Sequence, residues 1–162
     1  MFLLRLSGKL NSVVHKVKLK ILYKNRFSYK QLTVRGKLSV FLEDTARVEI
    51  GSAFFNRGCS LNAHKRIKIG DNCLFGENVK IYDHNHIYKR KGIPISQQGF
   101  TVADVVIGNN CWICSDVIIL KGVTIGDNVV IGAKCLIYKD IPSNSVVKSS
   151  DSLKISERID IV

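Results

Sequence analysis

An isoleucine recurs every six residues along the second half of the chain. Written in sixes, residues 107–142 read IGNNCW, ICSDVI, ILKGVT, IGDNVV, IGAKCL and IYKDIP, and isoleucine opens all six units. A small or β-branched apolar residue stands fifth in each unit. An α-helix cannot keep one face at a period of six, whereas a short strand followed by a turn can. The period therefore predicts a repeated strand–turn unit with its isoleucines inside.

The same pattern returns upstream in weaker form. IGDNCL, FGENVK and IY run from residue 69, and looser copies lie near residue 50 and at Val34 and Val40. Three units per coil would form a triangular prism, with isoleucines stacked inside and Gly-Asp-Asn turns at the corners. The repeat resembles that of left-handed parallel β-helix proteins, over about residues 34–147. We therefore expect an all-β protein of this fold.

The register also assigns most of the cysteines. Cys73, Cys111 and Cys135 are fifth in their units, where small inward-facing residues are expected, so we predict that they are core residues. Cys114 is second in its unit and should face outward near a corner. Five cysteines, an odd number, with one isolated C-x-x-C and no signal peptide argue against a secreted disulfide scaffold.

The six-residue period is lost between Ile81 and Ile107. The 26-residue separation is not a multiple of six, so a segment of about 82–106 must leave the prism as an extruded loop. The loop opens with the polar run Asp83, His84, Asn85 and His86 and continues into a basic stretch, YKRKG. Loops held on a rigid repeat scaffold commonly carry chemistry.

These motifs resemble those of hexapeptide-repeat acetyltransferases of the galactoside, maltose, nodulation and xenobiotic type. That family has a histidine at the start of an extruded loop, followed by IGxNxWIGxxxxIxxGVxIGxxxxIGAxSxVxKDIP. This chain reads IGNNCWICSDVIILKGVTIGDNVVIGAKCLIYKDIP. The DHNH form of the loop resembles acetyltransferases that decorate bacterial surface polysaccharides. The resemblance implies an acetyl-CoA-dependent O-acetyltransferase that modifies a sugar hydroxyl of a capsule or lipopolysaccharide, or its precursor. It also implies a homotrimer and no metal.

The resemblance assigns the catalytic role to the loop. The family's general-base histidine aligns with His86, and His84 is the alternative. A neutral imidazole can take the proton of a sugar hydroxyl as it attacks a thioester. Asp83 or a backbone carbonyl would hold the other ring nitrogen and fix the tautomer. We expect the acceptor-binding residues to be Asn62, His64 and Asn85; for His64 an ordinary surface role is the competing interpretation.

The resemblance places the acetyl-CoA contacts on the later coils. Trp112 would pack beside the thioester arm, and the backbone N–H of Ser115 would stabilise the oxyanion. Ala133 and Lys139 align with positions that contact the pantetheine and the phosphates. Cys114 replaces a glycine of the family motif, which would narrow the pantetheine channel. The family's AGNPAK-like segment is absent, and KSSDSLKISERIDIV stands in its place.

We expect three parts of the chain: an N-terminal arm (residues 1–33), the β-helix (34–147) and a C-terminal tail (148–162). The net charge is +12, and residues 1–42 hold ten Lys or Arg and no acid. Apolar residues at 3, 6, 10, 13, 14, 17 and 21 share one face of a predicted amphipathic helix, with Arg5, Lys9, Lys16 and Lys20 on its flank. Three roles stay open: capping the β-helix, contacting an anionic membrane through residues 1–24, and steering an acidic glycan.

Other functions were weighed against sugar O-acetylation. The same scaffold supports amino-sugar N-acetylation. A γ-type carbonic anhydrase would need zinc held by three histidines, for which only His64, His84 and His86 are available. A non-catalytic β-helix scaffold is the third alternative. No nucleic-acid motif accompanies the basic arm, and no apolar stretch reaches the length of a membrane span. We expect a cytoplasmic protein, with a peripheral contact at the inner face of the membrane as one option for the arm.

Overall fold

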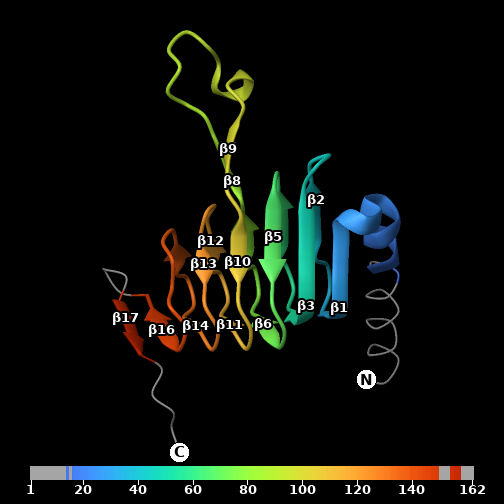
Figure 1. Ribbon diagram of the computed structural model, residues 1–162, viewed down its shortest axis with the longest axis vertical. Coiled ribbons are helices and arrows are strands. Elements are labelled where there is room, and N and C mark those ends of the chain that lie inside the picture. Colours follow the sequence, from blue (N-terminus) through green and yellow to red (C-terminus); the bar gives the residue numbers. More distant parts are fainter. Residues whose placement is uncertain (1–13, 15, 150–153, 158–162) are drawn as a thin grey trace, which may run out of the picture.

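The computed structural model describes residues 14, 16–149 and 154–157. Successive coils stack into a prism whose walls are parallel sheets, with a helical segment at one end and a long loop projecting from the middle (Figure 1). The fold class is confirmed as a left-handed parallel β-helix. This part of the chain begins with a helix over residues 16–23, followed by the 3-10 turn η1 (Lys24–Arg26).

The larger sheet covers two walls of the prism, because its first strands run around a corner. Its strands are β1 (Phe27–Val34), β3 (Arg47–Phe55), β5 (Arg66–Ile69), β6 (Cys73–Phe75), β10 (Val105–Ile107), β11 (Trp112–Ile113), β13 (Thr124–Ile125), β14 (Val130–Ile131), β16 (Ser145–Lys148) and β17 (Lys154–Glu157). The third wall is a five-stranded sheet of β2 (Ser39–Leu42), β4 (Ser60–Ala63), β7 (Lys80–Tyr82), β12 (Ile118–Ile119) and β15 (Leu136–Ile137).

The strand register follows the predicted hexads. Ile107 pairs with Ile125, and Ile119 pairs with Ile137, so each coil advances by eighteen residues, or three units. All of these isoleucines are buried, as are Cys73, Cys111 and Cys135 in the small inward positions. The predicted core is therefore confirmed. Side chains of the same kind stack on one another along the inside of the prism.

The turns between walls align along three edges of the prism. We call them the Asn edge (turns at 70–72, 108–111, 126–129 and 142–144), the Ser115 edge (56–59, 76–79, 114–117 and 132–135) and the loop edge (64–65, 83–104, 120–123 and 138–140). At the Asn edge Asn110 and Asn128 adopt φ values of 54° and 58°, the left-handed region that asparagine tolerates. Turns on successive coils bond through their side chains.

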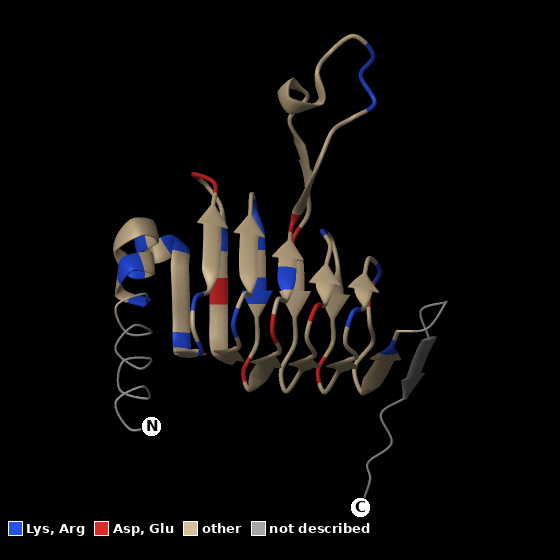
Figure 2. Cartoon of the chain, turned by 180° about the vertical axis from the view of Figure 1, so that it is seen from behind, with Lys and Arg blue, Asp and Glu red and all other residues tan. Residues whose placement is uncertain are grey.

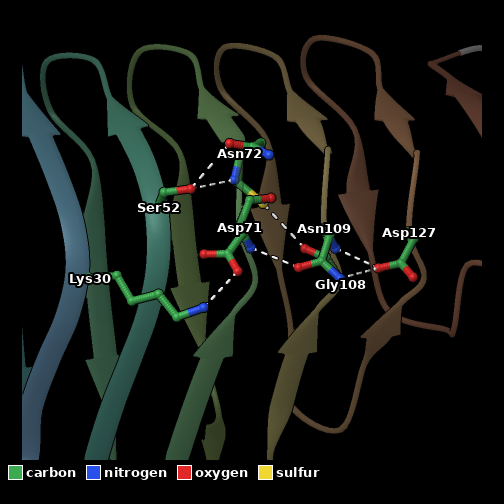
Figure 3. Close-up of polar contacts among 8 residues, drawn as sticks. Lys30, Ser52, Asp71, Asn72, Gly108, Asn109 and Asp127 are labelled. Atoms are coloured by element: carbon green, nitrogen blue, oxygen red, sulfur yellow. Dashed lines mark hydrogen bonds and ion pairs between the residues drawn. The ribbon is translucent and has the colours of Figure 1, made fainter.

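The Asn edge shows how the polar turn residues hold the coils in register (Figure 3). The Asp71 N–H donates to Asn109 Oδ1, and the Asn109 N–H in turn donates to Asp127 Oδ1, at 2.8 and 2.5 Å. Lys30, from the first coil, closes the row with an ion pair to Asp71 at 2.8 Å, which lowers the pKa of that carboxyl. Polar side chains of the Asn edge therefore join each turn to the next coil, and the edge has a structural role.

The helical arm caps the first coil through a face other than the predicted apolar stripe. Leu19 and Tyr23 are buried in the core, and Tyr23 Oη donates to the Val40 carbonyl at 2.9 Å. By contrast Val17 and Ile21, members of the predicted stripe, stay exposed, Ile21 by 71%. The other stripe residues before Val14 lie outside the described residues. The residues that cap the first coil and the residues of the predicted stripe thus lie on separate faces of one helix.

At the opposite end β17 (Lys154–Glu157) pairs antiparallel with β16. This strand lies within residues 148–162, which the sequence predicts to be a tail. Pairing of this kind covers backbone N–H and C=O groups that the last coil would otherwise leave open.

Tyr23→Ala should lower the free energy of unfolding by about 3 kcal/mol, because it removes a buried aromatic ring and a hydrogen bond to the first coil. The matched control is Ile21→Ala on the same helix, which should change it by less than about 0.5 kcal/mol. Denaturant titration at one protein concentration measures both. Equal effects of the two substitutions would contradict capping through the Tyr23 face.

Candidate active site

The loop leaves the prism after β7 and returns at β10, close to the predicted bounds of 82–106. Its stem is an antiparallel pair of β8 (His84–His86) and β9 (Phe100–Val102), and its tip contains the 3-10 turn η2 (Ile95–Gln97). The stem carries the tip well away from the coils (Figure 1). Because His84 and His86 are two apart on one strand, their side chains lie on the same face of the stem.

Asp83 fastens the base of this loop to the neighbouring coil. Its carboxylate is fully buried and accepts hydrogen bonds from the backbone N–H groups of His64, Lys65 and Arg66, at 2.8, 2.7 and 2.7 Å. Its Oδ1 also lies 3.2 Å from Nδ1 of His84. The residue therefore holds a turn and orients an imidazole. The sequence predicts Asp83 or a backbone carbonyl as the partner of the general base, His86, whereas in the structure Asp83 contacts His84. Its bonds to the turn at residues 64–66 were not predicted.

An aromatic cluster lines the stem above Asp83. The ring centroids of His64 and His84 are 3.7 Å apart, and Phe100 lies 4.3 Å from His64 and 4.4 Å from His86. Burial, with repulsion from His84 next, lowers the pKa of His64, which favours its neutral form. His64 is thus part of the site. Sequence reasoning missed Phe100, although its place opposite His86 follows once the hairpin register is known.

The two loop histidines differ in accessibility. Only 15% of the His84 side chain is exposed, because His64 covers it and Asp83 contacts its Nδ1. His86 is exposed and packs on Phe100. Asn85 between them is exposed, and Asn62 lies on β4 of the adjoining wall, where its carbonyl accepts the Asp83 N–H at 3.4 Å. An acceptor can therefore approach His86 directly, whereas His84 is held in place behind it.

The residues aligned with acetyl-CoA contacts gather mainly at the Ser115 edge. Trp112 projects from β11 and is exposed, and Ser115 and Ala133 occupy turns on successive coils. The Ser115 hydroxyl accepts the Glu77 N–H at 3.1 Å. No described residue accepts the Ser115 backbone N–H, which leaves this donor available. A free backbone donor of this kind can stabilise an oxyanion.

Cys114 lies partly buried beside Ser115. Burial raises the pKa of its thiol, so the sulfur stays protonated near neutral pH and is a poor nucleophile. The structure thus offers no chemical support for a catalytic thiol at Cys114, while its bulk stands where the family motif has a glycine.

Within one chain the two groups of residues lie on different edges of the prism. His86 belongs to the loop edge, between the five-stranded sheet and β10, and Lys139 lies in a later turn of that edge. Trp112 and Ser115 belong to the wall and edge on the other side of the five-stranded sheet. A single chain therefore does not bring His86 and Trp112 together.

The described residues contain neither a metal-binding cluster nor a helix that could span a membrane. No group of three or more His, Cys, Asp or Glu among them is arranged to hold a metal ion. His64 and His84 instead pack ring against ring, with centroids 3.7 Å apart and ring planes at 31°. None of the described helices has both the length and the hydropathy that a bilayer crossing requires.

The repeats match two family models. Residues 104–139 match the bacterial transferase hexapeptide model (six repeats), and residues 66–81 match the hexapeptide repeat of succinyl-transferase. Both matches lie in the coils on either side of the loop, where the isoleucine register is strongest.

Sequence relatives are named as acetyltransferases. The putative colanic acid biosynthesis acetyltransferase WcaF of Escherichia coli is 32% identical over 110 residues, covering 59% of this chain and 60% of that protein. The galactoside O-acetyltransferase of Escherichia coli is 37% identical over 112 residues, covering 66% of this chain and 52% of that protein. The chain thus spans 52–60% of the length of these relatives.

The fold is shared with a galactoside acetyltransferase solved in complex with coenzyme A. The TM-score is 0.67 at 29% identity, and the match covers 96% of this chain and 81% of that one. Together the matched models, the named relatives and this likeness show that the chain carries bacterial transferase hexapeptide repeats and shares its fold with a solved acetyltransferase.

Proposed function

We propose that this protein is an acetyl-CoA-dependent O-acetyltransferase that acetylates a sugar hydroxyl of a bacterial surface polysaccharide or its precursor. The observation that carries the proposal is an accessible imidazole, His86, beside a second imidazole that a buried carboxylate orients. Relatives named for colanic acid and lipopolysaccharide biosynthesis support the choice of acceptor class.

His86 acts as the general base. A sugar hydroxyl is too weak an acid to attack a thioester unaided, so the imidazole takes its proton as the C–O bond forms. The tetrahedral intermediate then collapses, the C–S bond breaks, and the proton passes from His86 to the departing thiolate. The ester and free coenzyme A are the products. His84 and Asp83 hold the stem in place during this step.

Ser115 stabilises the negative charge that develops on the carbonyl oxygen. Its backbone N–H has no acceptor among the described residues and so donates without breaking another bond. Trp112 offers an exposed indole beside it for the thioester arm, and Ala133 leaves room for the pantetheine on the next coil. These contacts fit a substrate that lies along the Ser115 edge.

The site is completed between subunits of a homotrimer. His86 and Ser115 lie on different edges of one prism, which supports a site in which His86 of one chain faces Trp112 and Ser115 of a neighbour. A closed three-fold ring supplies three such contacts, because each chain offers both edges.

The arm contacts an anionic membrane surface. Val17, Ile21 and Leu22 expose an apolar face that capping does not use, and Lys18 and Lys24 on the same segment are exposed. Residues 1–42 contain no acid to neutralise them. An exposed apolar face with flanking cations suits the headgroup region of an anionic bilayer, where each cation contributes about 1 kcal/mol.

Val17→Ser combined with Ile21→Ser should therefore reduce binding to vesicles of 30% phosphatidylglycerol by about tenfold, because it removes much of the exposed apolar face. Vesicle sedimentation at low and high salt measures the change, and wild-type binding should weaken with salt. Ile93→Ser with Ile95→Ser is the matched control for lost apolar area. Deletion of residues 1–24 is a poorer test, because it also removes Leu19 and Tyr23. Unchanged vesicle binding, or a lost subunit contact, would contradict the membrane assignment.

The activity is tested by incubating the protein with acetyl-CoA and a panel of glycans, then following thiol release and the mass gain of one acetyl group. Alkaline lability of the product distinguishes an O-acetyl ester from an N-acetyl amide on an amino sugar. Loss of turnover on metal chelation would instead favour the zinc chemistry of a γ-type carbonic anhydrase, and no transfer at all would favour a scaffold.

A further inference from the structure

The tip of the loop carries three adjacent cations, Lys89, Arg90 and Lys91. None of them has a role in the reaction proposed above. All three are exposed, and no described acid forms an ion pair with any of them. Between Asp83 and Asp104 the loop contains no acidic residue. Figure 2 shows the cations at the far end of the loop, away from the charges of the coils.

A buried glutamine, Gln98, forms hydrogen bonds across this tip. Gln98 is only 5% exposed, and its Oε1 accepts the Arg90 N–H at 3.0 Å. Its Nε2 donates to the carbonyls of Arg90 and Ile93 at 3.1 and 2.7 Å. The segment between Arg90 and Gln98 is thus closed on itself. A tip ordered in this way loses less conformational entropy on binding than an open loop does.

An exposed aromatic ring lies next to the cations. Tyr88 is 67% exposed and immediately precedes Lys89. Aromatic faces pack against the apolar faces of sugar rings, while cations pair with carboxylates or phosphates. Tyr88 and Lys91 follow His86 by two and five residues, respectively. In extended chain these separations span roughly 7 to 17 Å from His86. That reach is the length of one to three sugar units.

From these features we propose that residues 88–91 form an acceptor subsite for an anionic glycan. Tyr88 packs on a sugar ring, and the three cations bind a carboxylate or phosphate one to three sugars from the acetylated hydroxyl. The inference rests on the proposed function, and it specifies that the natural acceptor carries negative charge. The anionic groups belong to the glycan and not to coenzyme A.

The test measures binding, so that it does not depend on turnover. Labelled tetragalacturonate and glucose 1-phosphate serve as anionic probes, and maltotetraose serves as the neutral probe. The loop variant is Lys89→Ser, Arg90→Ser and Lys91→Ser together. The control removes the same charge from exposed lysines elsewhere, as Lys37→Ser, Lys68→Ser and Lys148→Ser.

We expect the loop variant to bind at least one anionic probe about tenfold more weakly, as loss of three exposed charge pairs implies, with maltotetraose binding unchanged. Tyr88→Ala should weaken the tetrasaccharides of both kinds. The control triple variant should bind all three probes as the wild type does. In every variant the affinity for acetyl-CoA and the trimer should be unchanged.

Four results would overturn the proposal. The first is that the wild type binds neither anionic probe, and the second is that the two triple variants lose the same affinity for these probes. The third is that the loop variant loses affinity for acetyl-CoA and not for the glycan, and the fourth is that the trimer of the loop variant dissociates. The third would assign the tip to the coenzyme phosphates, and the fourth to a subunit contact. An inactive protein that still binds the anionic probes through the tip would contradict the proposed function alone.

Discussion

His86→Ala should lower turnover by about 10²–10⁴, the usual range for loss of a positioned general base. The fold, the trimer and acetyl-CoA affinity should be unchanged, because His86 is exposed on the loop stem and takes no part in the isoleucine stack. A histidine base gives the rate an acidic limb in the pH profile, and that limb should disappear in the variant. Steady-state kinetics between pH 5 and 9 measure both effects.

His84→Ala is the matched control on the same strand. It removes a ring that packs on His64 and contacts Asp83, so it should loosen the stem without removing the base. We expect a smaller loss, of about tenfold or less, with the pH limb retained. If His84→Ala abolished turnover while His86→Ala remained active, the roles of the two histidines would be reversed. Two active variants would place the base outside the loop.

Asp83→Ala should lower the free energy of unfolding by about 3 kcal/mol. The substitution leaves three backbone N–H groups, of residues 64–66, without their acceptor in a buried site, and each unmade bond of this kind costs about 1–3 kcal/mol. Turnover should also fall, because His84 loses the group that orients it. Denaturant titration at fixed protein concentration gives the stability change.

Two comparisons sharpen this prediction. Asp83→Asn keeps the shape and one acceptor oxygen, so its destabilisation should be intermediate. Glu77→Ala removes an exposed carboxylate at another edge and should change stability by less than about 0.5 kcal/mol. A stability for Asp83→Ala within 0.5 kcal/mol of the wild type would mean that water or another group replaces the carboxylate, and that Asp83 does not fasten the loop.

The coils could be predicted from the sequence because each unit repeats one local requirement. Isoleucines such as Ile113 and Ile131 must stack, and only an eighteen-residue coil places them in line. The loop bounds followed from the loss of that period. The side chains within the loop carry no such period, so the contact between His64 and His84, which lie on successive coils, could be seen only in the structure.

In the N-terminal arm the sequence pattern did not predict which face of the helix contacts the first coil. Val17 and Ile21, the described end of the predicted stripe, lie exposed on the helix, and Leu19 and Tyr23 make the capping contact. Hydrophobic periodicity identifies an apolar face but does not identify what covers it. Likewise the sequence suggests Asp83 as a partner for a histidine. Nothing in the neighbouring residues indicates that its carboxylate also accepts hydrogen bonds from three N–H groups of an earlier turn.

The central claim is that His86 of one chain acts with Trp112 and Ser115 of its neighbour. It is tested most directly by mixing two inactive variants, His86→Ala and the double variant Trp112→Ala with Ala133→Trp, dissociated and reassembled in equal amounts. If the site lies between subunits, about a quarter of the sites receive an intact His86 from one chain and an intact coenzyme surface from the next, and about a quarter of wild-type turnover returns. Mixed trimers with no more activity than the separate variants would contradict the account.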